Sequence, residues 1–221
     1  MPRKTRPIGT EPAPELMLFD LDGVLIDSLP VMRAAWEAVS TQLGVRVPFE
    51  AYAEHLGRPF ADILAMLGLR ETEGFAETYE AEAVRFSHLA HPFPGVEQAL
   101  KGIVEAGCQL GVVTSKSAAR SRPLMEALGA PFAALRVPGQ GRGKPSPDTL
   151  LLALVDSKTD PAAALYVGDM AVDQEAARRA GVRYVHAAWG YGTPAEPLPL
   201  ILQEPAQLVD LVCERPAKRS A

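Results

Sequence analysis

The sequence predicts an α/β fold, a doubly wound parallel sheet with a small α-helical cap inserted after the first strand. Two observations support this prediction. Short apolar runs, each followed by a polar residue or glycine, alternate with helical patterns of about ten residues. Between residues 30 and 89 this alternation stops, and apolar residues recur at helical spacing. Alternating strands and helices are typical of a parallel sheet covered on both faces, and the helical block is typical of a separate lid.

The predicted strands are continuous apolar runs, because strands of a parallel sheet are buried on both faces. They span residues 16–19, 110–113 and 165–167, and residues 184–185 are a fourth candidate. Helical patterns cover residues 96–106, 117–128, 147–155 and 173–180. Gly129 and Gly181 follow two of these helices, where glycine readily adopts the left-handed conformation that ends a helix. The proline-rich stretch 194–205 predicts a surface loop that leads to a last short helix.

The expected domain boundaries follow from these patterns. Residues 15–29 and 91–213 form the α/β core, and residues 30–90 form the helical cap. Prolines and a glycine in segments 28–30 and 91–95 supply the rigid turns expected of two linkers. We expect residues 1–14 to be a disordered lead-in and residues 214–221 to be a flexible tail.

The composition excludes several classes of protein. Lys and Arg number 22 and Asp and Glu 27, a formal net charge of −5, which argues against a nucleic-acid partner. No apolar run reaches the length of a membrane span. The basic residues near the N-terminus precede no apolar segment, so they do not form a secretory signal, and two cysteines are too few for a disulfide framework. We therefore expect a cytoplasmic protein with no nucleic-acid or membrane partner; the composition identifies neither the partner nor the oligomeric state.

Polar residues follow the three clearest strands. They are Asp20 and Asp22 after the first, Thr114 after the second and Asp169 after the third. Asp and Thr also commonly cap helices, so each residue alone is weak evidence for a site. In open α/β sheets, however, ligands bind beyond the carboxyl ends of the strands. We therefore expect these four side chains to converge on one pocket.

The carboxylates predict a cation. Two carboxylates at short range, Asp20 and Asp22, tend to differ in pKa, so that one stays ionised while the other can hold a proton. Asp169 and Asp173 add further negative charge. A hard divalent cation with oxygen ligands would relieve this charge, and Mg²⁺ fits best if the substrate is a phosphate.

Four stretches, in order along the chain, resemble the motifs of the haloacid dehalogenase-like hydrolases. They are residues 19–28 (FDLDGVLIDS), 112–115 (VVTS), 143–148 (GKPSPD) and 167–173 (VGDMAVD). Most members of this family are magnesium-dependent phosphatases with a Rossmann-like core. Four motifs in register with the predicted strand ends are a far more specific signal than any one of them.

The resemblance implies a role for each motif residue. Asp20 would be the nucleophile that forms an aspartyl-phosphate, and Asp22 the acid and base. The phosphoryl group would be held by Thr114, Ser115 and Lys144. Mg²⁺ would be held by Asp20, by the backbone carbonyl of Asp22, by Asp169, and by Asp173 either directly or one step removed.

Two positions separate branches of the family. Asp22 points to phosphate esters, because dehalogenases and phosphonate hydrolases of this family lack an aspartate there. The sugar-phosphate mutases typically carry a histidine where this chain has Met32, which cannot relay protons. A phosphatase is therefore favoured over a mutase, and the complete motif set argues against a non-catalytic binding protein.

The cap leaves two substrates open. It resembles that of the phosphoglycolate phosphatase-like branch, and its expected specificity loop contains Gly57 and Arg58, the latter able to bind an anionic or polyhydroxyl group. Residues 55–68 also resemble the cap of phosphatases associated with 3-amino-5-hydroxybenzoate (AHBA) biosynthesis in antibiotic pathways. That resemblance implies an aminosugar phosphate, such as kanosamine 6-phosphate, as the alternative to phosphoglycolate.

Overall fold

A six-stranded parallel sheet forms the centre of the molecule. The computed structural model describes residues 12–69 and 73–213, so most of the predicted lead-in and all of the predicted tail lie outside the described residues. The strand order is β5-β4-β1-β6-β7-β8, and each neighbouring pair is parallel. The strands are β1 (Leu16–Phe19), β4 (Gln109–Val113), β5 (Phe132–Arg136), β6 (Ala164–Gly168), β7 (Arg183–Ala187) and β8 (Leu200–Leu202).

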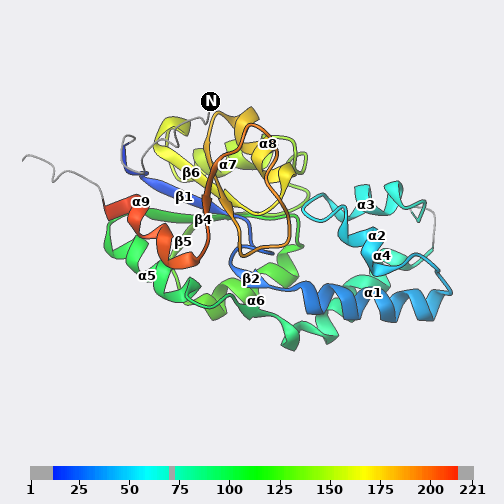
Figure 1. The fold of residues 1–221 in the computed structure, drawn as a ribbon. Helices are drawn as coiled ribbons and strands as arrows, with labels where there is room; N and C mark the ends of the chain where they lie inside the picture. The colour runs from blue at the N-terminus through cyan, green and yellow to red at the C-terminus, as the bar shows by residue number, and fades with distance from the viewer. Residues whose placement is uncertain (1–11, 70–72, 214–221) are drawn as a thin grey trace, which may run out of the picture.

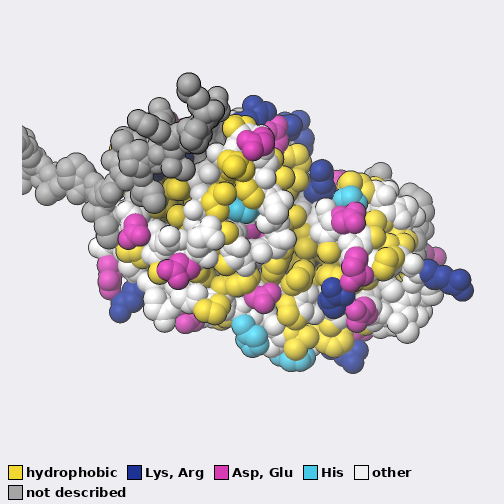
Figure 2. Space-filling model, in the orientation of Figure 1, with side chains coloured by type: hydrophobic (Ala, Val, Ile, Leu, Met, Phe, Trp, Pro, Cys, Tyr) yellow, Lys and Arg dark blue, Asp and Glu magenta, His cyan; other side chains and the backbone are white. Residues whose placement is uncertain are grey.

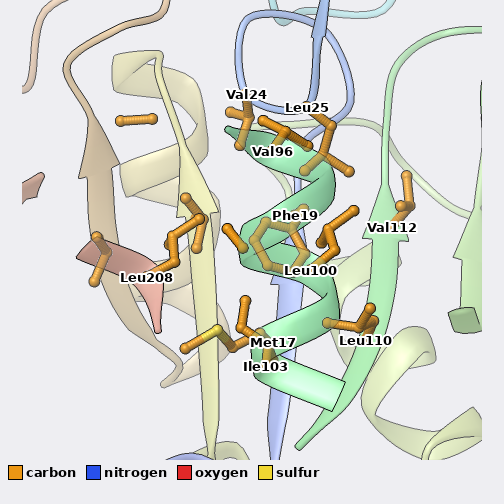
Figure 3. Packing of buried hydrophobic residues seen from close by; sticks show 14 of the residues in the cluster. Met17, Phe19, Val24, Leu25, Val96, Leu100, Ile103, Leu110, Val112 and Leu208 are labelled. Carbon is orange, nitrogen blue, oxygen red and sulfur yellow. The ribbon is translucent and has the colours of Figure 1, made fainter. Parts of the chain in front are cut away.

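Helices cover both faces of this sheet (Figure 1). One face packs against α5 (Val96–Glu105), α6 (Ala118–Leu128), η3 (Pro205–Leu208) and α9 (Asp210–Cys213), the other against α7 (Asp148–Asp156) and α8 (Ala171–Ala180), with η2 (Pro161–Ala163) leading into β6. Alternate β1 residues point to opposite faces, so Met17 and Phe19 meet Leu100 and Ile103 of α5, as Figure 3 shows. The predicted doubly wound α/β fold is confirmed.

A block of helices follows β1 and has its own hydrophobic core. It contains α1 (Leu29–Leu43), α2 (Phe49–Ala53), α3 (Phe60–Met66), α4 (Phe75–Arg85) and η1 (Ser87–Leu89), and it lies beside the sheet in Figure 1. Trp36 stacks on Tyr52 with 4.6 Å between ring centroids and meets the edge of Phe75 at 5.1 Å. The short strands β2 (Ile26–Asp27) and β3 (His91–Pro92) pair antiparallel where the chain enters and leaves this cap.

The two edge strands were not predicted. The stretch 194–205 was expected to be a surface loop, but it contains β8, which pairs with β7 through residues 200–202. The strand β5 pairs with β4 at the opposite edge and is only partly buried. Both edge strands are short apolar runs, FAALR and LIL, that directly follow a proline, and each has only one fully buried position. The adjacent prolines favour a loop in the sequence, although an edge strand with a single neighbour tolerates them.

The distribution of charged side chains on the surface agrees with the slightly negative net charge of the chain. On the face shown in Figure 2, Lys and Arg side chains lie among Asp and Glu and do not form a continuous basic stripe. Among the described residues, no helix has the length and apolar character needed to span a bilayer. A cytoplasmic location stays a prediction.

Candidate active site

The polar residues predicted to converge do so at the carboxyl edge of the sheet. Register brings this about, because Phe19 at the end of β1 lies opposite Val112 of β4 and Val167 of β6. Asp20 comes one residue after Phe19, whereas Thr114 and Asp169 come two residues after their paired valines, so all three lie at the same edge of the sheet. Asp20, Thr114 and Asp169 are 3%, 4% and 0% exposed, so their polar groups face a pocket that is closed to bulk water on most sides.

Lys144 lies at the centre of the buried charges. Its Nζ is 2.6 Å from Oδ2 of Asp20 and 2.7 Å from Oδ1 of Asp173, and its side chain is 1% exposed. Burial alone would lower the pKa of Lys144, but the charges of Asp173 and Asp20 outweigh it and raise that pKa above its ordinary value. Lys144 is therefore a fixed positive charge beside the carboxylate of Asp20.

Asp173 is fully engaged by protein groups. Its Oδ1 accepts hydrogen bonds from Lys144 and, at 3.0 Å, from the Tyr166 hydroxyl. Its Oδ2 accepts the backbone N–H of Met170 at 3.0 Å. The sequence left open whether Asp173 would contact a metal directly, and these contacts favour a role in holding Lys144.

Asp169 differs from Asp173, because only one of its two carboxylate oxygens accepts a hydrogen bond from the described residues. Its Oδ2 accepts the backbone N–H of Tyr191 at 2.8 Å, whereas the buried Oδ1 has no hydrogen-bond partner among residues 12–69 and 73–213. Burial raises the pKa of Asp169 well above its usual range, and Asp173 and Asp20 add to this effect. Two glycines make room for this carboxylate: a Cβ on Gly23 would lie 2.2 Å from its Oδ2, and one on Gly190 would lie 2.3 Å from its Cβ.

These observations fit a divalent cation. Oxygen atoms from Asp20, Asp169 and Asp173 lie within 4.8 Å of one another. Burial, the largest effect, raises the pKa of Asp20 to about 7 against the opposing charge of Lys144. Such clustered, poorly solvated carboxylates are the hard oxygen ligands that Mg²⁺ prefers, and the unpartnered Oδ1 of Asp169 supplies a free ligand atom.

Asp22 is held by two donors that the motif alone does not reveal. The hydroxyl of Ser28 donates to its Oδ1, and Nζ of Lys116 lies 3.0 Å from the same atom. Burial lowers the pKa of Lys116, and the charge of Asp22 partly opposes that effect. Lys116 was not among the predicted site residues, although its position two residues after Thr114 was the available signal.

An open pocket separates this edge of the sheet from the cap. It encloses about 620 Å³ of empty space, part of it open to solvent, and Asp20, Asp22, Thr114, Asp169 and Arg58 line it. The hydroxyl hydrogen of Thr114 is free to be donated into the pocket, because its Oγ1 serves as acceptor for the backbone N–H of Lys116 at 3.1 Å.

The cap loop touches the core beside this pocket. The Ser115 hydroxyl donates to the carbonyl of Gly57 at 2.8 Å, so this side chain joins the core to the cap. A Cβ on Gly57 would lie 2.8 Å from Val172, and its φ of +85° is a conformation that favours glycine. Gly57 therefore permits close contact of cap and core, and the neighbouring Arg58 lines the pocket.

Comparison with known proteins agrees with this architecture. Residues 17–187 match the model of the haloacid dehalogenase-like hydrolase family. This chain belongs to that family. The hydrolase is 32% identical over 208 residues to a phosphoglycolate phosphatase of Aquifex aeolicus, covering 89% of this chain and 96% of that protein. It is 30% identical over 211 residues to an N-acetylmuramic acid 6-phosphate phosphatase of Pseudomonas aeruginosa, covering 89% and 93%.

A solved structure described as a haloacid dehalogenase-like hydrolase, from Bacteroides fragilis, superimposes with a TM-score of 0.80. It is 25% identical and covers 88% of this chain and 99% of that one. These relatives cover 88–89% of this chain and the first two are phosphatases, so the hydrolase is a phosphatase-like member of its family.

Two further sets of side-chain contacts in the hydrolase were not predicted from its sequence. Arg120 of α6 lies 3.5 Å from Glu80 of α4, and the Ser117 hydroxyl donates to the same carboxylate at 3.3 Å. The Tyr191 hydroxyl accepts the backbone N–H groups of Ser28 and Leu29 at 2.7 and 3.1 Å. These contacts join core and cap across long stretches of sequence, so no local pattern predicts them.

Proposed function

We propose that this protein is a Mg²⁺-dependent phosphatase that hydrolyses a small phosphomonoester through an aspartyl-phosphate. The observation that carries the proposal is the convergence of Asp20, Thr114 and Asp169 on one pocket beneath the cap, with Lys144 2.6 Å from Asp20. Lys144 holds Asp20 in place and brings positive charge to the position of the phosphoryl oxygens. Asp20 and Asp169 are the side chains that would hold Mg²⁺, together with the carbonyl of Asp22. When bound, the cation supplies positive charge that favours ionised carboxylates and offsets the charge of the phosphate.

The side chains support a reaction in two steps. In the first, a carboxylate oxygen of Asp20 attacks phosphorus, the bond from phosphorus to the alcohol oxygen breaks, and Asp22 gives its proton to that oxygen. In the second, Asp22 takes a proton from water as the water oxygen attacks phosphorus. Phosphate leaves, and the Asp20 carboxylate is regenerated. Thr114 can donate a hydrogen bond to the phosphoryl group in both steps.

Release of inorganic phosphate from p-nitrophenyl phosphate tests this proposal. The wild-type protein should turn over with added Mg²⁺ and stop when EDTA is added. Asp20→Asn should reduce turnover to background while the far-ultraviolet circular dichroism stays unchanged, because the amide is not a nucleophile. Lys101→Met, on an exposed lysine of α5, is the matched control and should behave as wild type. Full activity of Asp20→Asn would refute the aspartyl-phosphate mechanism.

Two observations bear on the alternatives. Met32 lines the pocket at the position where the mutases carry a proton-relaying histidine, which favours transfer of the phosphoryl group to water over transfer to a second sugar. A non-catalytic binding protein would not release phosphate in the assay above. The name of the Aquifex aeolicus relative favours phosphoglycolate, whereas that of the Pseudomonas aeruginosa relative, an N-acetylmuramic acid 6-phosphate phosphatase, favours an aminosugar phosphate. Neither name is linked to AHBA biosynthesis, so that pathway rests on the resemblance of residues 55–68 alone.

A further inference from the structure

A second, smaller pocket adjoins the main pocket that contains the candidate active site. It encloses about 400 Å³ of empty space, part of it open to solvent. Its lining consists of Pro59, Thr114, Ser115, Pro138, Gly139, Gly141, Gly143, Lys144 and Thr149. Thr114 and Ser115 line the main pocket as well, so they form part of the wall between the two. The second pocket therefore reaches the residues that are expected to hold the phosphoryl group.

The cap loop that contains Arg58 completes this wall. Gly57 and Arg58 line the main pocket, whereas Pro59 lines the second one. The Ser115 hydroxyl donates to the carbonyl of Gly57 at 2.8 Å. A Cβ on Gly143 would lie 2.3 Å from Cγ of Pro59, so the proline ring packs directly on that glycine. A side-chain hydrogen bond and a van der Waals contact thus hold the loop between the pockets, and a small displacement of the loop would join them.

The two pockets differ in charge. The main pocket is lined by acidic and basic side chains, namely Asp20, Asp22, Glu80, Asp169, Arg58, Lys116 and Arg120. Among the described residues that line the second pocket, Lys144 is the only charged one. Asp20 and Asp173 balance part of its charge, but neither of them lines this pocket. A phosphate anion in the second pocket therefore passes one cation and no carboxylate, whereas the carboxylates of the main pocket repel it and the cations there retain it.

A buried hydroxyl in the second pocket lacks a protein partner. Thr149 is 4% exposed, and its Oγ1 makes no hydrogen bond with residues 12–69 and 73–213. Buried hydroxyl groups nearly always have a partner, so we expect a water molecule or an oxygen of an anion to supply it. The neighbouring carboxylate of Asp148 accepts hydrogen bonds from Arg142 at 2.9 and 3.1 Å and from Ser146 at 2.7 Å, so its charge is compensated.

We propose that inorganic phosphate leaves the active site through this second pocket. The proposal rests on the proposed phosphatase function and adds the route taken by the second product. In that mechanism the alcohol leaves first, on the side of Asp22, which lines only the main pocket of the two. The phosphate that forms afterwards lies against Thr114 and Lys144, and both residues line the second pocket. A shift of the cap loop at Pro59 opens the way, and the hydroxyl of Thr149 donates a hydrogen bond to the departing phosphate.

Oxygen exchange between water and inorganic phosphate labelled with oxygen-18 tests this route. Phosphate that enters the site forms the aspartyl-phosphate again and releases one of its oxygens as water, and hydrolysis then brings in an oxygen from the solvent. The number of oxygens replaced before the phosphate leaves increases when release becomes slower. The isotope pattern therefore reports the rate of release relative to chemistry, whichever step limits turnover.

Two substitutions change the second pocket in opposite directions. Pro138→Trp places a large side chain at an exposed position of its lining. We expect release to slow by about 5-fold or more, while kcat/KM for p-nitrophenyl phosphate stays within about 2-fold because the alcohol departs earlier. Pro59→Ala removes the ring that packs on Gly143 and should reduce the number of oxygens replaced. Pro131→Trp, also at an exposed proline but before β5 rather than after it, is the matched control and should behave as wild type.

The outcomes separate this proposal from the phosphatase assignment. A wild-type isotope pattern in Pro138→Trp, with circular dichroism showing an intact fold, would overturn the proposal because phosphate would then leave through the main pocket. A fall in kcat/KM as large as the slowing of release would also overturn it, because the substrate would then use the second pocket. If Pro138→Trp does not fold, Pro59→Ala decides, and an unchanged pattern there refutes the route. Absence of both exchange and hydrolysis in the wild type would refute the phosphatase assignment itself.

Discussion

Replacing Lys144 by methionine tests whether this buried cation holds the carboxylate cluster together. The side chain keeps a similar length and loses its charge. At an effective dielectric constant of 20, each contact of 2.6–2.7 Å carries about 6 kcal/mol of attraction, most of which compensates for burying the charges. Without Lys144, Asp20 and Asp173 have oxygens within 4.8 Å of each other, a repulsion of at least about 3 kcal/mol.

The net loss should therefore be about 3–5 kcal/mol of unfolding free energy, as found when one partner of a buried pair is removed. Uptake of a proton limits the loss, because the pKa of Asp20 stands at about 7 even with Lys144 present. For a chain of this size the loss corresponds to a decrease of about 6–20 °C in Tm.

Urea unfolding followed by circular dichroism, at neutral pH and with EDTA, measures this free energy. EDTA is needed because a bound cation would replace part of the missing charge. Lys101→Met, which removes a lysine that is 77% exposed, is the control and should change the free energy by less than about 0.5 kcal/mol. A loss below about 1 kcal/mol in Lys144→Met would refute the reasoning, since the cluster would then be stable without its cation.

Three further substitutions test the cap and its contacts. Gly57→Ala should cost about 1–2 kcal/mol and lower kcat/KM, because the φ of +85° disfavours a side chain and the new Cβ would lie 2.8 Å from α8; unchanged kinetics would contradict this. Tyr191→Phe should cost about 1–3 kcal/mol in urea unfolding, because the backbone N–H groups of Ser28 and Leu29 lose their acceptor, and an unaltered midpoint would show that water replaces it. Trp36→Ala should destabilise the cap by about 3–5 kcal/mol, seen as faster hydrogen exchange in α1 and α4, while protection of β1 and β4 persists.

Local patterns were sufficient for the central strands and for the end of the sheet where the site lies. The run at residues 16–19 coincides with β1, because four consecutive buried positions require four apolar residues. Gly129 and Gly181 both adopt the left-handed conformation that was expected from their place after a helix. The edge strands β5 and β8 were not predicted because they are short, only partly buried and directly preceded by prolines, which favour a loop.

Some features of the site could likewise be predicted from local patterns, and others could not. Asp20, Thr114 and Asp169 were predicted to meet because each follows a strand, and parallel strands end at a common edge. Lys144 pairs with Asp20 across 124 residues, and only its motif indicated that it belongs there. Asp173 was correctly expected near the cluster, but its two occupied oxygens could not be inferred without side-chain positions.

The sequence by itself determined the family, the doubly wound sheet and the convergence of acidic residues, because these follow from hydrophobic periodicity and from motifs of adjacent residues. The tertiary structure alone decided which charges touch. It paired Lys116 with Asp22, joined Glu80 to Arg120 between cap and core, and left one oxygen of Asp169 without a partner in the part of the chain that the structure describes. Such contacts depend on how separate elements pack and on where each side chain points. Neither property is encoded in a local pattern, and both determine which substrate the pocket can accept.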